Sequence, residues 1–384
     1  MCTRNSPRSL AEMKKVILVA GVHPSRPTAS GIRAYVRNIA RGLHERGYEV
    51  HLVGVGPRER LAYGEFHTLT SRIPISQYEF AWRLVLWLKN RPPLSGAIIH
   101  VQRPDDLIPF LVRTRECGYI CTLHGEPFRG VNLRRPFGRF LYAGAERFAL
   151  AKATRVISVS KTGLESYLRR YPWLAAKMEY VPIGIDTRNF NPSKASITQF
   201  RSGGEGNRRI LFAGRLEREK RVHILLEACR DIRPPPAILI AGTGTLEAEL
   251  RNHPGASNAN FLGAVRSEDM PNLMASVDAL VLPSAYEGMP TVALEALACG
   301  TPVISTRVGD LGSVIVEGQN GFFFDGSSVS LSNVLTNHLG ELTGMRRTCA
   351  SSVSAYDVRI VLDKIEEIYE GGAADWLEPQ SRDY

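Results

Sequence analysis

Residues 281–306, VLPSAYEGMPTVALEALACGTPVIST, place a strand, a turn, a helix and a second strand in close succession. The apolar run at residues 279–282 predicts a buried strand, and residues 303–305 predict another. Between them, Pro290 lies at the start of the predicted helix, and Gly300 and Pro302 follow its end, the usual order of start and stop signals. This succession is typical of a parallel α/β sheet.

Two glutamates lie eight residues apart in this stretch, Glu287 in the turn and Glu295 in the helix. The helix is apolar almost all round, so we expect it to be buried, and a buried carboxylate needs a partner. Free N–H groups at a helix start attract anions. The two carboxylates and the helix start could therefore line one elongated polar ligand. In the alternative, Glu295 pairs with an arginine and Glu287 is a solvated turn residue.

Length and composition indicate a globular protein of two domains, with 384 residues, 44% hydrophobic and 22% charged. The cysteines show no C-x-x-C or zinc-ligand spacing, which favours a reducing compartment and disfavours a disulfide frame or a metal site. They are Cys2, Cys117, Cys121, Cys229, Cys299 and Cys349. No apolar run has the length of a membrane span. We therefore expect a cytoplasmic protein without a transmembrane segment.

The charge is unevenly distributed along the chain. Residues 1–192 contain 30 Lys and Arg against 14 Asp and Glu, a balance of +16, and the remaining half has a balance of −6. A basic first half suggests an anionic partner: nucleic acid, a phosphate-bearing substrate or an acidic membrane surface. No recognised nucleic-acid-binding motif accompanies the charge, so we expect no nucleic acid partner.

The first half opens as a Rossmann-like sheet. Residues 15–21 predict a strand, a loop ends at Gly31, a helix follows, and residues 50–53 predict the next strand. The loop lacks G-x-G-x-x-G, which disfavours a dehydrogenase. Further strands are predicted at residues 97–101, 119–123 and 155–160. His124 follows the second of these, at the strand end where open parallel sheets bind ligands; the alternative is a hydrogen-bonded loop histidine.

The second half repeats the pattern after a polar, turn-rich linker. A strand at residues 210–213 leads to Gly214, Arg215 and Lys220, which could clamp an anion through a bidentate guanidinium and a point charge. Strands at residues 237–241 and 260–265 bring in Gly242 and Gly263. The alternative for the two cations is solvated loop charge.

The pattern S-x-x-E-G-x-P-x-x-x-L-E-A-x-A-x-G-T-P-V around Glu287 and Glu295 resembles the E-x7-E signature of retaining nucleotide-sugar glycosyltransferases of family 4, which have the GT-B fold. The T-x-H-G around His124, the G-R-L…K of Arg215 and Lys220, and the A-G-x-G at Gly242 are also similar to that family. The chain departs from its pattern at Ser30, where a glycine pair is common, and at Arg221, where glycine is common.

The resemblance implies two Rossmann-like parallel-sheet domains facing each other across a cleft. It implies front-face sugar transfer with retention at the anomeric carbon and with no metal or other cofactor. Arg215 and Lys220 would bind the donor diphosphate, Glu287 the sugar hydroxyls and Glu295 the ribose, while His124 would orient the sugar. The remaining donor-binding residues that it implies are Gly31, Gly214, Gly242, Gly263, Val265, Gly288, Met289, Pro290 and Thr291.

We expect a disordered tail at residues 1–13, an acceptor-binding domain at 14–192, a linker at 193–208, a nucleotide-sugar-binding domain at 209–355, and a final helix and tail at 356–384 that cross back to the first domain.

The predicted partners are a nucleotide-sugar donor, UDP-linked before GDP-linked, and a glycan or lipid-linked acceptor in cell-envelope or exopolysaccharide biosynthesis. The basic domain could also bind an anionic membrane surface. The alternatives are a catalytically silent binding protein with the same fold and a nucleotide-sugar epimerase.

Overall fold

The computed structural model describes residues 14–24, 31–73, 75–90, 94, 96–113, 117–126, 136–194 and 208–377. The predicted tail at residues 1–13 and most of the predicted linker lie outside these ranges. The chain divides into two compact units. The first comprises Met1–Pro24, Ile32–Gly184 and Val358–Tyr384, and the second Ser25–Gly31 and Ile185–Asp357. The chain thus passes from the first unit to the second after Gly184, before the predicted boundary at residue 192.

The first unit is built on a seven-stranded sheet of order β3-β2-β1-β4-β5-β6-β7 in which each paired strand is parallel to its neighbour. Its strands are β1 (Lys15–Val19), β2 (Glu49–Gly54), β3 (Glu65–Thr68), β4 (Ile98–Val101), β5 (Gly118–Leu123), β6 (Arg155–Ser158) and β7 (Met178–Tyr180). Its α-helices are α1 (Gly31–Glu45), α2 (Gln77–Lys89), α3 (Ile108–Arg113), α4 (Pro136–Lys152), α5 (Lys161–Arg170) and α12 (Val358–Leu377).

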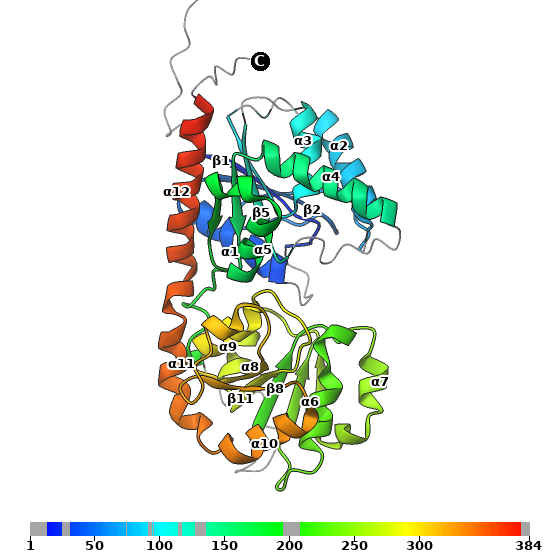
Figure 1. Ribbon diagram of the computed structural model, residues 1–384, viewed down its shortest axis with the longest axis vertical. Helices are drawn as coiled ribbons and strands as arrows, with labels where there is room; N and C mark the ends of the chain where they lie inside the picture. Colours follow the sequence, from blue (N-terminus) through cyan, green and yellow to red (C-terminus); the bar gives the residue numbers. More distant parts are fainter. Residues whose placement is uncertain are drawn as a thin grey trace, which may run out of the picture. The chain divides into compact units, whose positions relative to one another are not determined.

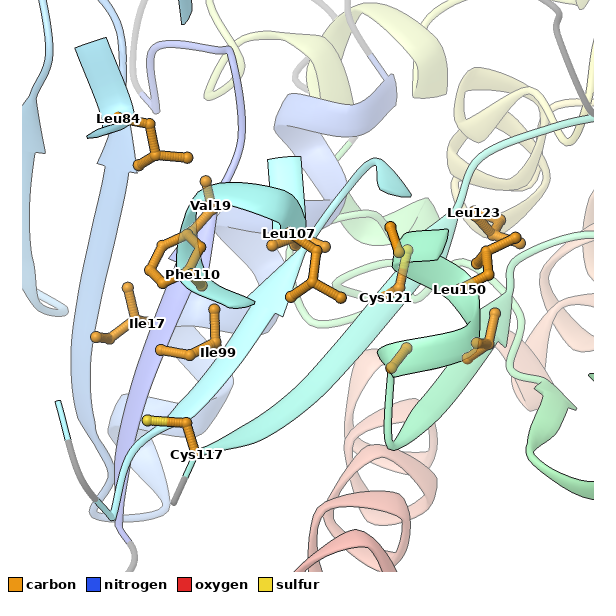
Figure 2. Packing of buried hydrophobic residues seen from close by; sticks show 14 of the residues in the cluster. Ile17, Val19, Leu84, Ile99, Leu107, Phe110, Cys117, Cys121, Leu123 and Leu150 are labelled. Atoms are coloured by element: carbon orange, nitrogen blue, oxygen red, sulfur yellow. The ribbon is translucent and has the colours of Figure 1, made fainter. Parts of the chain in front are cut away.

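The hydrophobic core of this unit lies between the central strands and the helices that cover one face of the sheet. Figure 2 shows Ile17 of β1 and Ile99 of β4 beside Phe110 of α3, with Leu84 of α2 nearer to Val19 of β1. All five side chains are at most 1% exposed. Strands buried on both faces read as near-continuous apolar runs, which is why their positions were predictable.

Helix α12, red in Figure 1, packs on α1. A Cβ at Gly42 would lie 2.0 Å from Leu362 Cδ1, so a larger residue there would require the Leu362 side chain to shift. The Arg46 guanidinium forms ion pairs with Asp363, at 2.7 Å, and with Glu366. The last helix therefore completes the first unit.

The second unit has a six-stranded sheet of order β10-β9-β8-β11-β12-β13, again parallel in each pair. Its strands are β8 (Arg209–Ala213), β9 (Ala237–Ala241), β10 (Ala259–Gly263), β11 (Ala279–Leu282), β12 (Val303–Thr306) and β13 (Gly321–Phe324). Its α-helices are α6 (Val222–Cys229), α7 (Glu247–Arg251), α8 (Met270–Ala275), α9 (Thr291–Ala298), α10 (Ser328–His338) and α11 (Arg346–Ser352). The expectation of two parallel α/β domains is confirmed.

Helix α9 corrects one expectation from the sequence. Most of its residues are buried, but Val292 and Glu295, three residues apart, are half-buried. Residues three apart share a helix face, so α9 has a partly exposed side that carries the carboxylate. We expected a buried helix, and Glu295 is instead half-buried, on a side that it shares with the apolar Val292.

Among the helices of the described ranges, none combines the length and apolarity needed to cross a bilayer.

Candidate functional site

The candidate site of the second unit lies where β8 and β11 end. These two strands are neighbours in the sheet, with Ala279 opposite Ile210 and Leu280 opposite Leu211. The carboxyl ends of parallel strands meet at one edge, so the loops that follow β8 and β11 lie against each other. The Ala285 N–H donates to the Glu219 carbonyl across 2.8 Å, which joins the two loops directly.

Lys220 and Glu287 form an ion pair between these loops. The Lys220 ammonium donates to Glu287 Oε1, and the Ser284 hydroxyl donates to the same oxygen at 2.8 Å. The side chains of Lys220 and Glu287 are only 18% and 12% exposed. Glu287 is therefore not a solvated turn residue, and that alternative is wrong. Removing one partner of such a pair leaves a largely buried charge without compensation.

Arg215 differs from Lys220 in its exposure. Its guanidinium donates to Glu219 Oε1 at 2.8 Å, and the two side chains are 54% and 42% exposed. An exposed ion pair of this kind contributes little to stability. Arg215 can therefore exchange Glu219 for another anion at small energetic cost.

Arg221 occupies the position at which glycine is common in the resembling family. Its φ of 48° and ψ of 42° lie in the left-handed region, which glycine adopts most easily. The side chain offsets this strain, because its guanidinium donates to the Pro283 carbonyl at 3.0 Å and to the Gly326 carbonyl at 2.6 Å. Besides the Ala285–Glu219 backbone bond and the Lys220–Glu287 ion pair, the Arg221 side chain is thus a third connection between the loops after β8 and β11.

Three glycines line the ends of β8, β9 and β10. The Gly214 N–H donates to the Ala241 carbonyl at 2.9 Å, and the Gly242 N–H donates to the Gly263 carbonyl at 2.7 Å. Gly242 has a φ of 140°, and a Cβ there would lie 1.8 Å from the Gly214 oxygen. Any side chain would force these strand ends apart. The glycines therefore keep a surface of bare backbone, next to the half-buried Val265.

The turn before α9 is also held by the loop that follows β12. The Asp310 N–H donates to the Gly288 carbonyl at 2.9 Å. Met289 is 7% exposed, and Pro290 occupies the N-cap position of α9 without a capping side chain. Thr291 is also 7% exposed, and its hydroxyl has no hydrogen-bond partner among the described residues. A buried polar atom of this kind at a helix start indicates a ligand position.

In the first unit, His124 follows β5 as predicted and is held by a neighbouring side chain. Its Nε2 lies 2.8 Å from the Gln102 Oε1, which can only accept, so Nε2 carries the proton and Nδ1 a lone pair. The Tyr35 ring meets the imidazole edge-on, with centroids 5.0 Å apart. Desolvation by burial lowers the pKa of His124 to about 4, so the ring is neutral at pH 7.

Gln102 was missed by sequence reasoning, although its position carries a signal. It comes directly after β4, which pairs with β5, so it lies at the same sheet end as His124. It is 3% exposed. A polar residue directly after an apolar strand of a parallel sheet therefore predicts a site residue, just as a histidine there does.

A second histidine, His100, lies within β4, the strand next to β5. His100 on β4 is fully buried, with Nδ1 2.7 Å from the Tyr369 hydroxyl of α12 and Nε2 2.6 Å from the Thr122 hydroxyl. Burial, and to a lesser degree the charge of His124, lowers the pKa of His100 to about 3. The structure therefore keeps two neighbouring imidazoles neutral.

The predicted residues of the second unit converge on one sheet edge and the turn before α9. Gly31 opens α1 and is exposed. His124 lies in the first unit and has its own supporting residues there.

Two family models match the chain: "Glycosyltransferase Family 4" over residues 29–189 and "Glycosyl transferases group 1" over residues 196–342. Glycogen synthase of Mycobacterium tuberculosis is 30% identical over 221 residues, which cover 51% of this chain. The match spans about half of that relative, 53% of its length.

An Escherichia coli UDP-Gal:alpha-D-GlcNAc-diphosphoundecaprenol alpha-1,3-galactosyltransferase is 26% identical, over 71% of this chain and 74% of the relative. Sucrose-phosphate synthase from Thermosynechococcus elongatus is similar in structure, with a TM-score of 0.79 and 20% identity, over 94% of this chain and 99% of that one. The fold and the family models together assign the chain to the GT-B class of glycosyltransferases. The chain belongs to glycosyltransferase family 4.

The strain at Arg221 can be separated from its hydrogen bonds by two substitutions. Arg221→Ala loses both bonds and keeps the left-handed backbone, whereas Arg221→Gly loses the bonds and relieves the strain. We expect Arg221→Ala to be the less stable variant by about 1 kcal/mol. Urea unfolding measures the difference. Arg230→Ala, a change at an exposed ion pair of the same unit, should alter stability by less than about 0.5 kcal/mol. A less stable Arg221→Gly would contradict this account.

The neutral His100 predicts a pH dependence of stability. Its imidazole takes up a proton in the unfolded chain below pH 6.5 but stays neutral in the folded chain until about pH 3. Unfolding therefore becomes easier as the pH falls, and His100 should contribute a loss of about 2 kcal/mol between pH 7 and pH 5. Unfolding free energies at both pH values should show a smaller loss for His100→Gln. His44→Gln, at an exposed histidine, should keep the wild-type loss, and equal losses in all three proteins would refute the assignment.

Proposed function

We propose that the protein transfers a hexose-type sugar from a nucleotide diphosphate donor, with retention at the anomeric carbon. We expect a UDP-sugar as the donor in the first place and a GDP-sugar in the second. The observation that carries this proposal is the Lys220–Glu287 pair beside the start of α9, where the Thr291 hydroxyl is buried without a partner among the described residues. A cation, a carboxylate and free helix N–H groups match a ligand with a diphosphate at one end and hydroxyls at the other.

Each group has a separate task in this proposal. Lys220 and the exposed Arg215 bind the diphosphate and stabilise the negative charge that develops as it departs. Glu287 accepts hydrogen bonds from the sugar hydroxyls, and the half-buried Glu295 accepts them from the ribose. The bare backbone around Gly242 and Gly263 leaves room for the nucleotide base. Since two cations and a helix start neutralise the diphosphate, the transfer needs no metal.

His124 acts as a hydrogen-bond acceptor in this reaction. Its Nε2 proton is directed to Gln102, so Nδ1 offers a lone pair to a sugar hydroxyl. An imidazole with a pKa of about 4 stays neutral at the pH of the cell and is not a general acid there. We expect it to orient the sugar.

The acceptor is a glycan or a lipid-linked saccharide of cell-envelope or exopolysaccharide biosynthesis. The E. coli relative is named for a diphosphoundecaprenol-linked acceptor. An acceptor of this kind suits the basic first half of the chain, where cationic groups attract phosphates.

A face of α2 offers a way to reach such an acceptor at a membrane. Phe80, Leu84 and Leu88 point into the core, while Tyr78 and Trp82 are 76% and 60% exposed. Tyr78 and Trp82 are four residues apart and share one side of the helix. Exposed aromatic residues beside basic ones favour the interface of an anionic bilayer, so we propose a peripheral association there.

A donor panel tests the reaction directly. The full chain is incubated with UDP-, GDP- and ADP-sugars, and hydrolysis, transfer and thermal shift are recorded. We expect slow hydrolysis and stabilisation with one nucleotide class. Stabilisation without turnover, with and without candidate acceptors, would indicate a silent binding protein, and release of an epimerised nucleotide sugar would indicate an epimerase.

Paired variants separate catalysis from stability at the ion pair. Lys220→Met leaves Glu287 largely buried without its cation and should lower stability by about 3 kcal/mol. Adding Glu287→Gln removes the charge and should recover much of that loss. Transfer should fall at least about 100-fold in both proteins, because the diphosphate loses its cation. Arg215→Ala, at an exposed pair, should lose transfer with stability near wild type. Recovery of transfer in the double variant would refute the catalytic assignment.

Vesicle sedimentation tests the membrane association. The wild-type chain should sediment with vesicles that contain anionic phospholipid, less so in high salt, and Trp82→Ser should weaken this several-fold. Val329→Ser removes a side chain of the second unit that is 70% exposed and should have no effect. Equal sedimentation of both variants would exclude α2 as the contact.

A further inference from the structure

Strands β2 and β3 each carry the sequence Glu-x-His. β2 contains Glu49-Val50-His51, and β3 contains Glu65-Phe66-His67. Alternate residues of a strand share one face of the sheet. The parallel register sets His51 opposite Glu65, so all four polar side chains lie on the same face. The pairing of β2 with β3 thus brings together a His/Glu cluster from two separate segments of the sequence.

The ligand-type atoms of this cluster converge. His51 Nδ1 lies 2.9 Å from His67 Nε2, and the Glu65 carboxylate lies 3.5 Å from His51 Nδ1. The ligand atoms of His51, Glu65 and His67 all lie within 4.8 Å of one another. The two imidazole planes are 11° apart and their centroids 5.2 Å apart, so the rings meet edge to edge through these nitrogens. The histidine side chains are 12% and 5% exposed, and Glu65 is 63% exposed, so one side is open to water.

Glu49 sets the tautomer of His51. The Glu49 carboxylate lies 2.7 Å from His51 Nε2 and can only accept, so Nε2 carries the hydrogen. Nδ1 therefore presents a lone pair toward His67 and Glu65. Lys15 donates to the same carboxylate at 3.1 Å and fixes its position. A carboxylate behind the far nitrogen of an imidazole is the usual support of a metal-binding histidine.

We propose that His51 Nδ1, His67 Nε2 and the Glu65 carboxylate bind one Zn²⁺ ion, with water in the fourth position. Two imidazoles and a carboxylate form a ligand set that zinc prefers. Tetrahedral Zn–N bonds of about 2.0–2.1 Å require a few tenths of an ångström more between the two nitrogens and a turn of the rings, which now aim these nitrogens at each other. They also require the His67 hydrogen on Nδ1, which lies 3.4 Å from the Glu65 carboxylate. Mg²⁺ and Ca²⁺ prefer oxygen ligands and do not suit this set.

The ion ties β3 to β2 at the edge of the first unit's sheet. β3 is the outermost strand and pairs with β2 alone within the described sheet. The site is independent of the proposed sugar transfer, whose cations and carboxylates lie in the second unit. Its role is to stabilise an edge strand, so its consequence is measured on metal content and stability.

Zinc competition tests the site. The full chain is stripped with a chelator, dialysed and titrated with Zn²⁺ against a chromophoric chelator. We expect one equivalent bound by wild type, with loss of binding in His51→Gln and at least about tenfold weaker binding in Glu65→Gln and Glu49→Gln. Glu65 is exposed, so its variant keeps the fold. His338→Gln removes a histidine that lies 3.3 Å from Glu341 and belongs to no metal-ligand cluster among the described residues, and it should bind as wild type.

Two further measurements report on the same ion. At one Zn²⁺ concentration, the Tm of wild type and of His338→Gln should rise by the same amount and the Tm of Glu65→Gln by less. The His67 and Trp87 rings have centroids 5.5 Å apart, so Cu²⁺ at the site should quench Trp87 fluorescence, and the quenching should disappear in Trp87→Phe.

No Zn²⁺ uptake by wild type would overturn the proposal and leave a hydrogen-bonded histidine pair. Uptake that is equal in wild type, His51→Gln and Glu65→Gln would overturn it as well, because the ion would then lie elsewhere. Loss of binding in His338→Gln would have the same meaning.

Discussion

The contact on which the second unit's site depends is the ion pair of Lys220 and Glu287. β8 and β11 are adjacent, and the loops that follow them are joined by this pair, by the Ala285–Glu219 backbone bond and by the Arg221 guanidinium. The charges proposed for diphosphate and for sugar thus neutralise each other before any ligand arrives. A donor must therefore offer each of them a better partner, which favours a ligand that has both an anionic and a hydroxyl-rich end.

Arg221 shows how a departure from a family pattern can be compensated locally. A glycine at this position would need no support, since its backbone adopts the left-handed region freely. The arginine is strained there and bonds to two carbonyls of neighbouring loops. The consequence is a loop whose conformation depends on the hydrogen bonds of the Arg221 side chain.

Buried strands were predictable from the sequence, and the exceptions have physical causes. β9 and β11 match residues 237–241 and 279–282 because each is a continuous apolar run. β3, with Glu65 and His67 in four residues, has no such run, so half of the His/Glu cluster was hidden. Glu287 and Lys220 were singled out by the family pattern. Gln102 was not, because no family motif includes it. Its place at the end of an apolar strand was a signal, but its contact with His124 follows only from the pairing of β4 with β5.

The first unit is assembled from stretches that are far apart in the chain, and this has a consequence for its folding during translation. Helix α12 supplies the partners of Gly42 and Arg46, and its Tyr369 contacts His100. These groups emerge only after residues 185–357 have been translated. The second unit can therefore complete its sheet before the first unit is complete. The strands of the first unit are translated earlier, but His100 is covered only when the last helix has been made.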